Sequence, residues 1–189
     1  MKYRFHTALA ALLLSLAASG TGSPESTYTA DGRLKFPTNY REWIFLSSGL
    51  DMSYRQRPDM QGHSMFDNVF VDPVAYQAFL RTGTWPEQTL LVLEVRGASD
   101  KGSINKSGKF QSTELMGVEV HVKDTKRFAN GWAFFGFEAG TEPARQIPTG
   151  ADCYSCHQQH GAVDTTFVQF YPTLLPIATR KRTLSPGSN

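Results

Sequence analysis

The chain has 189 residues and a formal net charge of +2 at neutral pH. This charge is too small to indicate binding to nucleic acid or to an anionic membrane surface. Thirteen Phe, seven Tyr and three Trp residues supply large apolar side chains, which suit either an ordinary core or the wall around a flat cofactor.

The first 20 residues have the pattern of a secretory signal peptide. Lys2 and Arg4 supply a positive start, and an apolar stretch over residues 8–18 is followed by small residues. This stretch is too short to span a bilayer, and an uncleaved membrane anchor is the alternative. We therefore expect a periplasmic protein that is cleaved near Gly20 and is not held in the membrane.

The remaining chain has the length of one domain. Residues 21–35 are polar and are expected to be flexible, as are residues 181–189 at the end. Residues 36–180 are sufficient to bury a sizeable core, and they contain no internal repeat.

Sequence patterns in residues 36–180 indicate an α+β fold. A short helix is expected over residues 40–46, and a second helix begins at Asp72-Pro73 and ends at Gly83. Because strand patterns dominate the middle of the chain, with helices before and after them, we expect an antiparallel β-sheet core with flanking helices. The expected strands cover residues 66–71, 89–95, 118–122 and 132–137, and the expected loops cover residues 51–64 and 97–109.

The most specific motif is the run Cys153-Tyr154-Ser155-Cys156-His157, which has the C-x-x-C-H form of a c-type haem attachment site. On a helical turn, two intervening residues bring both thiols towards neighbouring vinyl groups of one porphyrin. The next residue, His157, can then reach the iron as an axial ligand. The chain has no other cysteine. We expect one covalently attached haem c on a helix near the C-terminus.

Other readings explain fewer of these residues. A thioredoxin-like redox pair gives no reason for the adjacent histidine, and a disulfide across two residues would be strained. A zinc site would need His160 as its fourth ligand, within an unusually short run. We expect His160, His63 in a loop and His121 on the polar side of its strand not to contact the haem.

Several segments, in this order, resemble the cytochrome P-460 family, which includes the cytochromes c′-beta. The resemblance covers residues 36–175 and implies a homodimer, largely of β-sheet, with one haem per subunit and an iron that is open on its distal side. Its landmarks are Asn39-Tyr40-Arg41-Glu42-Trp43, Val69-Phe70-Val71-Asp72-Pro73, Val122-Lys123-Asp124, Arg127-Phe128-Ala129-Asn130, Trp132-Ala133-Phe134-Phe135, the Cys153–His157 run and Phe170-Tyr171-Pro172.

The same resemblance bears on the function. In hydroxylamine-oxidising members of the family, a lysine on a central strand is joined covalently to the porphyrin, and Leu93 stands at the matching position here. Leucine cannot form this link. We therefore expect a five-coordinate haem that binds a small diatomic ligand, nitric oxide first, in an apolar distal pocket. Candidate wall residues are Leu93, Phe66, Phe70 and Phe134.

Two alternatives stay open. The first is an enzyme that oxidises hydroxylamine or nitric oxide, for which Asp152 is a weak candidate for the catalytic base and otherwise a helix cap. The second is an electron-transfer cytochrome with a periplasmic redox partner. Against the second, all five methionines precede His157, whereas common small carriers place the sixth ligand, a methionine, after the motif.

Overall fold

The computed structural model describes residues 27–53, 63–138 and 140–187. The expected signal peptide therefore lies outside the described residues. Within them, no helix combines the length and the apolar character that crossing a membrane requires.

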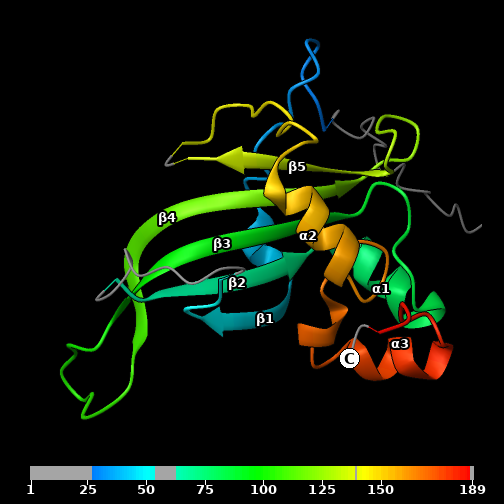
Figure 1. The fold of residues 1–189 in the computed structure, drawn as a ribbon. Coiled ribbons are helices and arrows are strands. Elements are labelled where there is room, and N and C mark those ends of the chain that lie inside the picture. Colours follow the sequence, from blue (N-terminus) through cyan, green and yellow to red (C-terminus); the bar gives the residue numbers. More distant parts are fainter. Residues whose placement is uncertain (1–26, 54–62, 139, 188–189) are drawn as a thin grey trace, which may run out of the picture.

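One antiparallel sheet of five strands forms the centre of the protein (Figure 1). Its strands follow one another in space in chain order, so that β1 and β5 are the two edges. Together with the helices at its ends and on its face, this sheet confirms the expected α+β class. The strands are β1 Ile44–Leu50, β2 Met65–Val71, β3 Leu90–Ser99, β4 Phe110–Lys123 and β5 Trp132–Phe137.

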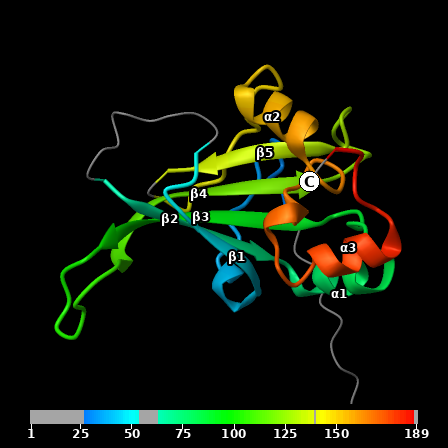
Figure 2. The ribbon, with the colours of Figure 1, turned by 60° about the horizontal axis from the view of Figure 1, so that its bottom comes forward.

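The helices lie before, between and after the strands. A one-turn 3-10 helix, η1 (Tyr40–Glu42), precedes β1, and α1 (Pro73–Thr82) connects β2 to β3. After the sheet come α2 (Asp152–His160), the 3-10 turn η3 (Val168–Phe170) and α3 (Leu175–Lys181). Figure 2 shows α3 beside α1, and Thr183 after α3 donates a hydrogen bond to the carbonyl of Gly83 after α1.

Helix α1 has the ends that its sequence predicts. The Asp72 carboxylate accepts a hydrogen bond from the backbone N–H of Ala75 at 2.8 Å, which satisfies one free donor of the first turn. Gly83 ends the helix in the left-handed conformation, with φ of 77°, which glycine adopts without steric cost.

Three segments differ from the sequence-based expectation. The helix expected over residues 40–46 is only the turn η1, because Ile44 already pairs with Val71 of β2. Strand β4 extends well beyond residues 118–122: its first half pairs with β3 through bulges and is mostly exposed, so it shows no apolar alternation. Residues 27–35, expected to be flexible, form a turn whose Leu34 is fully buried.

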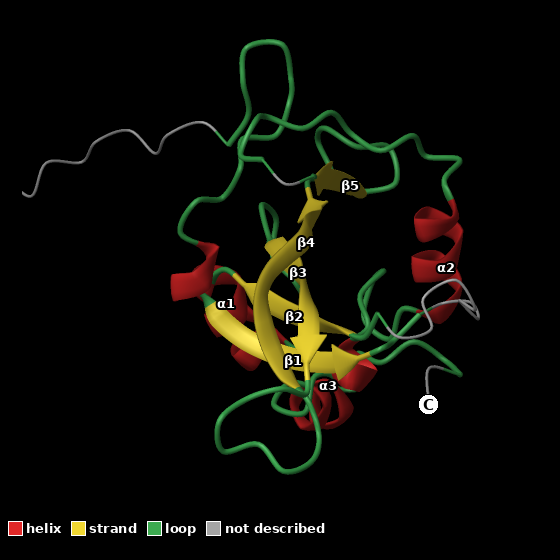
Figure 3. Ribbon diagram, turned by 90° about the vertical axis from the view of Figure 1, so that its left-hand side faces the viewer, coloured by secondary structure: helices red, strands yellow, loops and turns green. Residues whose placement is uncertain are grey.

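Each face of the sheet has its own cover over part of its area. One face packs against α1, α3 and the segment after α2, and includes Val71, Leu91 and Trp132. The other face packs against the N-terminal segment around Leu34, and includes Val92. Figure 3, turned by 90° from Figure 1, shows α2 on one side of the sheet. The alternation of side chains along each strand therefore decides which residues can meet α2.

Candidate functional site

Helix α2 carries all the residues of the C-x-x-C-H motif, and none of them is fully buried. Cys153 and His157 are four residues apart, which places them one above the other on the same face. Cys153 and Cys156 are free thiols, each partly exposed. Asp152 is the first residue of α2 and is exposed, and no side chain caps this helix. The expected capping role of Asp152 is therefore wrong.

A tyrosine inside the motif fixes α2 over strand β5. The Tyr154 hydroxyl donates to the carbonyl of Ile147 at 3.0 Å and accepts from the backbone N–H of Phe134 at 3.2 Å. The ring of Tyr154 meets the Phe134 ring edge-on, with centroids 4.9 Å apart. These contacts set the distance between α2 and the sheet, and this distance determines where the side chains of the motif lie relative to the sheet.

The His157 ring is held in one orientation by its neighbours. Its Nδ1 lies 2.7 Å from the backbone carbonyl of Thr165, so Nδ1 carries the proton and Nε2 carries the lone pair. The rings of Phe167 and Phe134 pack against it, with centroids 4.2 and 4.7 Å away. Burial lowers the pKa of His157, which favours the neutral ring. A neutral imidazole whose Nδ1–H is bonded to a carbonyl is the usual form of a metal-ligating histidine.

His121 lies directly beside His157, on the side of β4 that the sequence indicated as polar. Its side chain is only 8% exposed, and its ring stacks on Phe134 at 3.9 Å and contacts the His157 ring at 5.0 Å. Its Nε2 is 3.3 Å from the Thr165 hydroxyl, so Thr165 contacts both histidines. The polar side of β4 is buried here because α2 and the segment after it cover it. His121 is paired with Phe134 across β4 and β5. This pairing, had it been recognised in the sequence, would have indicated that His121 is buried.

Next to His121, the same face of the sheet is less covered. Leu93, Glu119 and Gly136 lie side by side on β3, β4 and β5. We call this patch, together with Val95 and Gly117, the open sheet surface, because each of its residues is partly or fully exposed among the described residues. Leu91 points to the same face but is only 4% exposed, in the core under the helices.

Glu119 brings a negative charge to this surface. Its side chain is exposed, yet enough protein surrounds the carboxyl group that burial raises its pKa. Burial also raises the pKa of the Cys153 thiol, and the charge of Glu119 raises it further. The carboxylate therefore lies near the first thiol of the motif. Sequence reasoning missed Glu119, although it alternates with Val118 and Val120 on the same side as His121.

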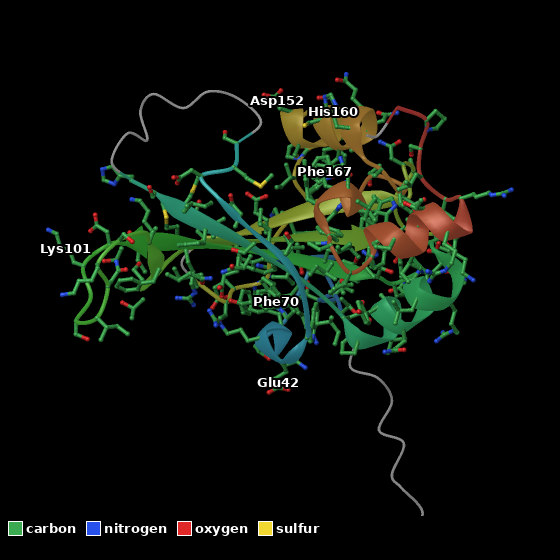
Figure 4. The ribbon with its side chains drawn as sticks, turned by 90° about the horizontal axis from the view of Figure 1, so that it is seen from below. Glu42, Phe70, Lys101, Asp152, His160 and Phe167 are labelled. Carbon is green, nitrogen blue, oxygen red and sulfur yellow. The ribbon has the colours of Figure 1, made fainter. Side chains whose placement is uncertain are left out.

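The four expected wall residues separate onto two faces. Phe134 packs on His157, and Leu93 belongs to the open sheet surface. Phe66 and Phe70 point to the opposite face, where Phe70 meets the rings of Tyr40 and Phe45. Figure 4 shows Phe70 on the far side of the sheet from Asp152 and His160. The structure therefore does not bring Phe66 and Phe70 to His157.

The arrangement fits a haem. Two free thiols and an imidazole lie on one helix, and the adjacent sheet offers apolar surface at Leu93 and Val95. These are the groups needed for two thioether bonds, one iron ligand and an apolar contact with the porphyrin. His160, which a zinc site would need as its fourth ligand, is exposed on α2. In the described part of the chain, no three or more His, Cys, Asp or Glu side chains form a group suited to a metal ion.

Comparison with known proteins supports the same assignment. The sequence matches the family described as cytochrome P460 over residues 37–168, a range that spans the whole sheet, α2 and the segment that holds His157. No curated protein matches the chain.

Proposed function

This chain belongs to the cytochrome P460 family, which implies a haem cofactor, and we propose that it is a mono-haem c-type cytochrome with nitric oxide as its ligand. Cys153 and Cys156 would carry the two thioether bonds, and His157 would ligate the iron. One observation carries this proposal: both thiols and the imidazole share α2, with Nδ1 of His157 held by the Thr165 carbonyl.

The bound haem supplies a redox-active iron with a coordination position for a small ligand. The chain supplies the surroundings. Thr165, Phe134 and Phe167 orient the His157 ring, and Leu93 and Val95 offer apolar contact without a hydrogen-bond donor. Without such a donor, bound dioxygen is not stabilised, whereas nitric oxide bonds to iron without this help. We therefore propose nitric oxide sensing, scavenging or storage as the role.

Location and assembly belong to the same proposal. Covalent haem attachment in bacteria takes place outside the cytoplasmic membrane, which agrees with the signal pattern of residues 1–20. We propose a periplasmic homodimer, on the basis of that pattern and of the family resemblance.

Hydroxylamine oxidation is the second candidate, because the site contains a carboxylate. Oxidation of hydroxylamine needs a base that accepts protons, and Glu119 lies across from Leu93 with a raised pKa. Leucine at position 93 argues against this activity, since it cannot form the lysine link of the oxidising relatives. Asp152 is a weaker base candidate because it lies at the start of α2, outside the open sheet surface.

Intact mass and optical spectra test these proposals. In acid and organic solvent, the purified protein should keep the mass of the processed chain plus one haem, because thioether bonds survive both. Cys153→Ala/Cys156→Ala should lose this mass increment. Ser155→Ala changes an exposed residue between the cysteines and should keep it. Release of free haem, or stoichiometric zinc in its place, would overturn covalent attachment.

Ligand experiments separate the functions. The ferrous protein should give an ordinary high-spin spectrum and bind nitric oxide tightly, with negligible oxidation of hydroxylamine in the presence of an electron acceptor. A strongly red-shifted Soret band or steady hydroxylamine turnover would favour the enzyme. A six-coordinate spectrum that nitric oxide does not change would favour an electron carrier.

A further inference from the structure

We infer that Glu119 is a specificity-determining residue, whose carboxylate keeps anionic ligands away from the haem iron and so favours uncharged ones. This inference rests on the proposed haem site. It goes beyond that site because it assigns a role to a residue outside the C-x-x-C-H motif.

The position of Glu119 follows from the alignment of β4 with α2. His121 of β4 contacts His157 of α2. Glu119 lies two residues before His121 on β4, a distance of about 7 Å along a strand. Cys153 lies four residues before His157 on α2, a distance of about 6 Å along a helix. The two steps are similar in length, and α2 runs in roughly the same direction as β4 in Figures 1 and 2, so Glu119 should lie beside Cys153. The effect of its charge on the Cys153 thiol agrees with this placement.

The charge of Glu119 is not neutralised by its surroundings. Among the described residues, Glu119 has no hydrogen-bond or ion-pair partner, and its neighbours in register, Leu93 and Gly136, have no side-chain donor. Glu94, the next residue after Leu93 and on the opposite face of β3, behaves differently: Arg41 and Arg96 both pair with it. The paired carboxylate of Glu94 therefore faces away from the site, and the unpaired carboxylate of Glu119 faces towards it.

An unpaired carboxylate beside a haem discriminates between ligands by their charge. At an effective dielectric constant of about 20, one unit charge acting on another over about 8 Å changes an equilibrium roughly tenfold or more. Azide and nitrite are anions at neutral pH and are disfavoured. Nitric oxide, hydroxylamine and carbon monoxide are uncharged and are not. The same negative charge favours ferric over ferrous iron and so lowers the reduction potential. In a one-electron couple, each tenfold change in the equilibrium constant shifts this potential by about 59 mV.

The test replaces Glu119 by glutamine in the haem-loaded protein. Glu119→Gln keeps the size of the side chain and removes the charge. Glu119→Asp keeps the charge, and Glu114→Gln removes an exposed charge elsewhere on β4. Azide and imidazole are titrated into the ferric proteins and carbon monoxide into the ferrous proteins, and the reduction potential of each is measured.

Glu119→Gln should bind azide roughly tenfold more tightly, with imidazole and carbon monoxide affinities unchanged and a higher reduction potential. Glu119→Asp and Glu114→Gln should behave like the unmodified protein. If Glu119→Gln raised the affinities for azide and imidazole equally, the change would be in the access of ligands to the iron, and the inference would be overturned. An unchanged azide affinity would also overturn it. If the unmodified protein carries no haem, the proposed function fails first, and the inference fails with it.

Discussion

Glu94 connects the first family landmark to the central strand, and its removal should destabilise the protein. Its carboxylate is 1% exposed and accepts hydrogen bonds from Tyr40, Arg41, Asn68 and Arg96. Burial alone would raise the pKa of Glu94, but these donors and charges outweigh burial and lower it. Glu94→Ala removes the acceptor while the donors stay in place.

The structure sets the expected magnitude. Arg96 has a side chain that is 17% exposed, so it would lose its partner in a largely buried position. Breaking a buried ion pair in this way costs about 3–5 kcal/mol. The Arg41 side chain is 53% exposed, and its pair adds only about 0–1 kcal/mol. We expect a loss at the lower end of this sum, about 3 kcal/mol in the free energy of unfolding, because Arg96 is not completely buried. A domain with about 5–15 kcal/mol of stability survives this loss.

Urea denaturation of the haem-loaded protein at pH 7, followed by circular dichroism, measures this loss. Glu42→Ala is the matched control, because Glu42 is an exposed residue of η1 and should change the free energy of unfolding by less than about 0.5 kcal/mol. A loss below about 1 kcal/mol for Glu94→Ala would refute the reasoning, since the network would then contribute no more than an exposed pair.

The same variant should show a characteristic pH dependence. Because the pKa of Glu94 is lower in the folded state than in the unfolded chain, its stabilisation is complete above the unfolded value of about 4.3. It is lost as the pH falls through the lower folded value. The difference between the unmodified protein and Glu94→Ala should therefore be largest near pH 7 and should shrink below about pH 4. A difference that stays constant down to pH 3 would contradict this assignment.

Three further predictions concern the site and α1. His157→Ala should keep the covalent haem in intact-mass measurements but change the optical spectrum at every pH; an unchanged spectrum would mean that another residue ligates the iron. Leu93→Lys should give only partial cross-linking of the haem, as measured by mass spectrometry. The introduced amine would lie opposite Glu119. The double variant Leu93→Lys/Glu119→Gln leaves this amine unpaired, so it should unfold at a lower urea concentration than Leu93→Lys. Asp72→Ala should cost about 1–2 kcal/mol in urea denaturation, since Asp72 also accepts from the backbone of Leu90; equal stability would show that the cap contributes nothing.

The sequence alone determined the features that depend on neighbouring residues. The C-x-x-C-H spacing of Cys153, Cys156 and His157 has its meaning within one helical turn. Asp72 and Gly83 end α1 by contacts within a few residues, and the apolar run at residues 132–137 is a strand in the structure, as predicted. The order of these segments also predicted the α+β class and the resemblance to the family that the family match confirms.

Tertiary structure decided which face of each strand meets α2. His121 and Glu119 read as polar positions of a half-exposed strand, yet one is buried on His157 and the other lies near Cys153. Phe70 reads as a wall residue, yet it points to the opposite face. Alternation within a strand divides its residues into two sets, but it does not say which set a distant helix will cover. That choice depends on the packing of α2 over β5, through contacts such as the one between Tyr154 and Phe134, which join residues far apart in the chain.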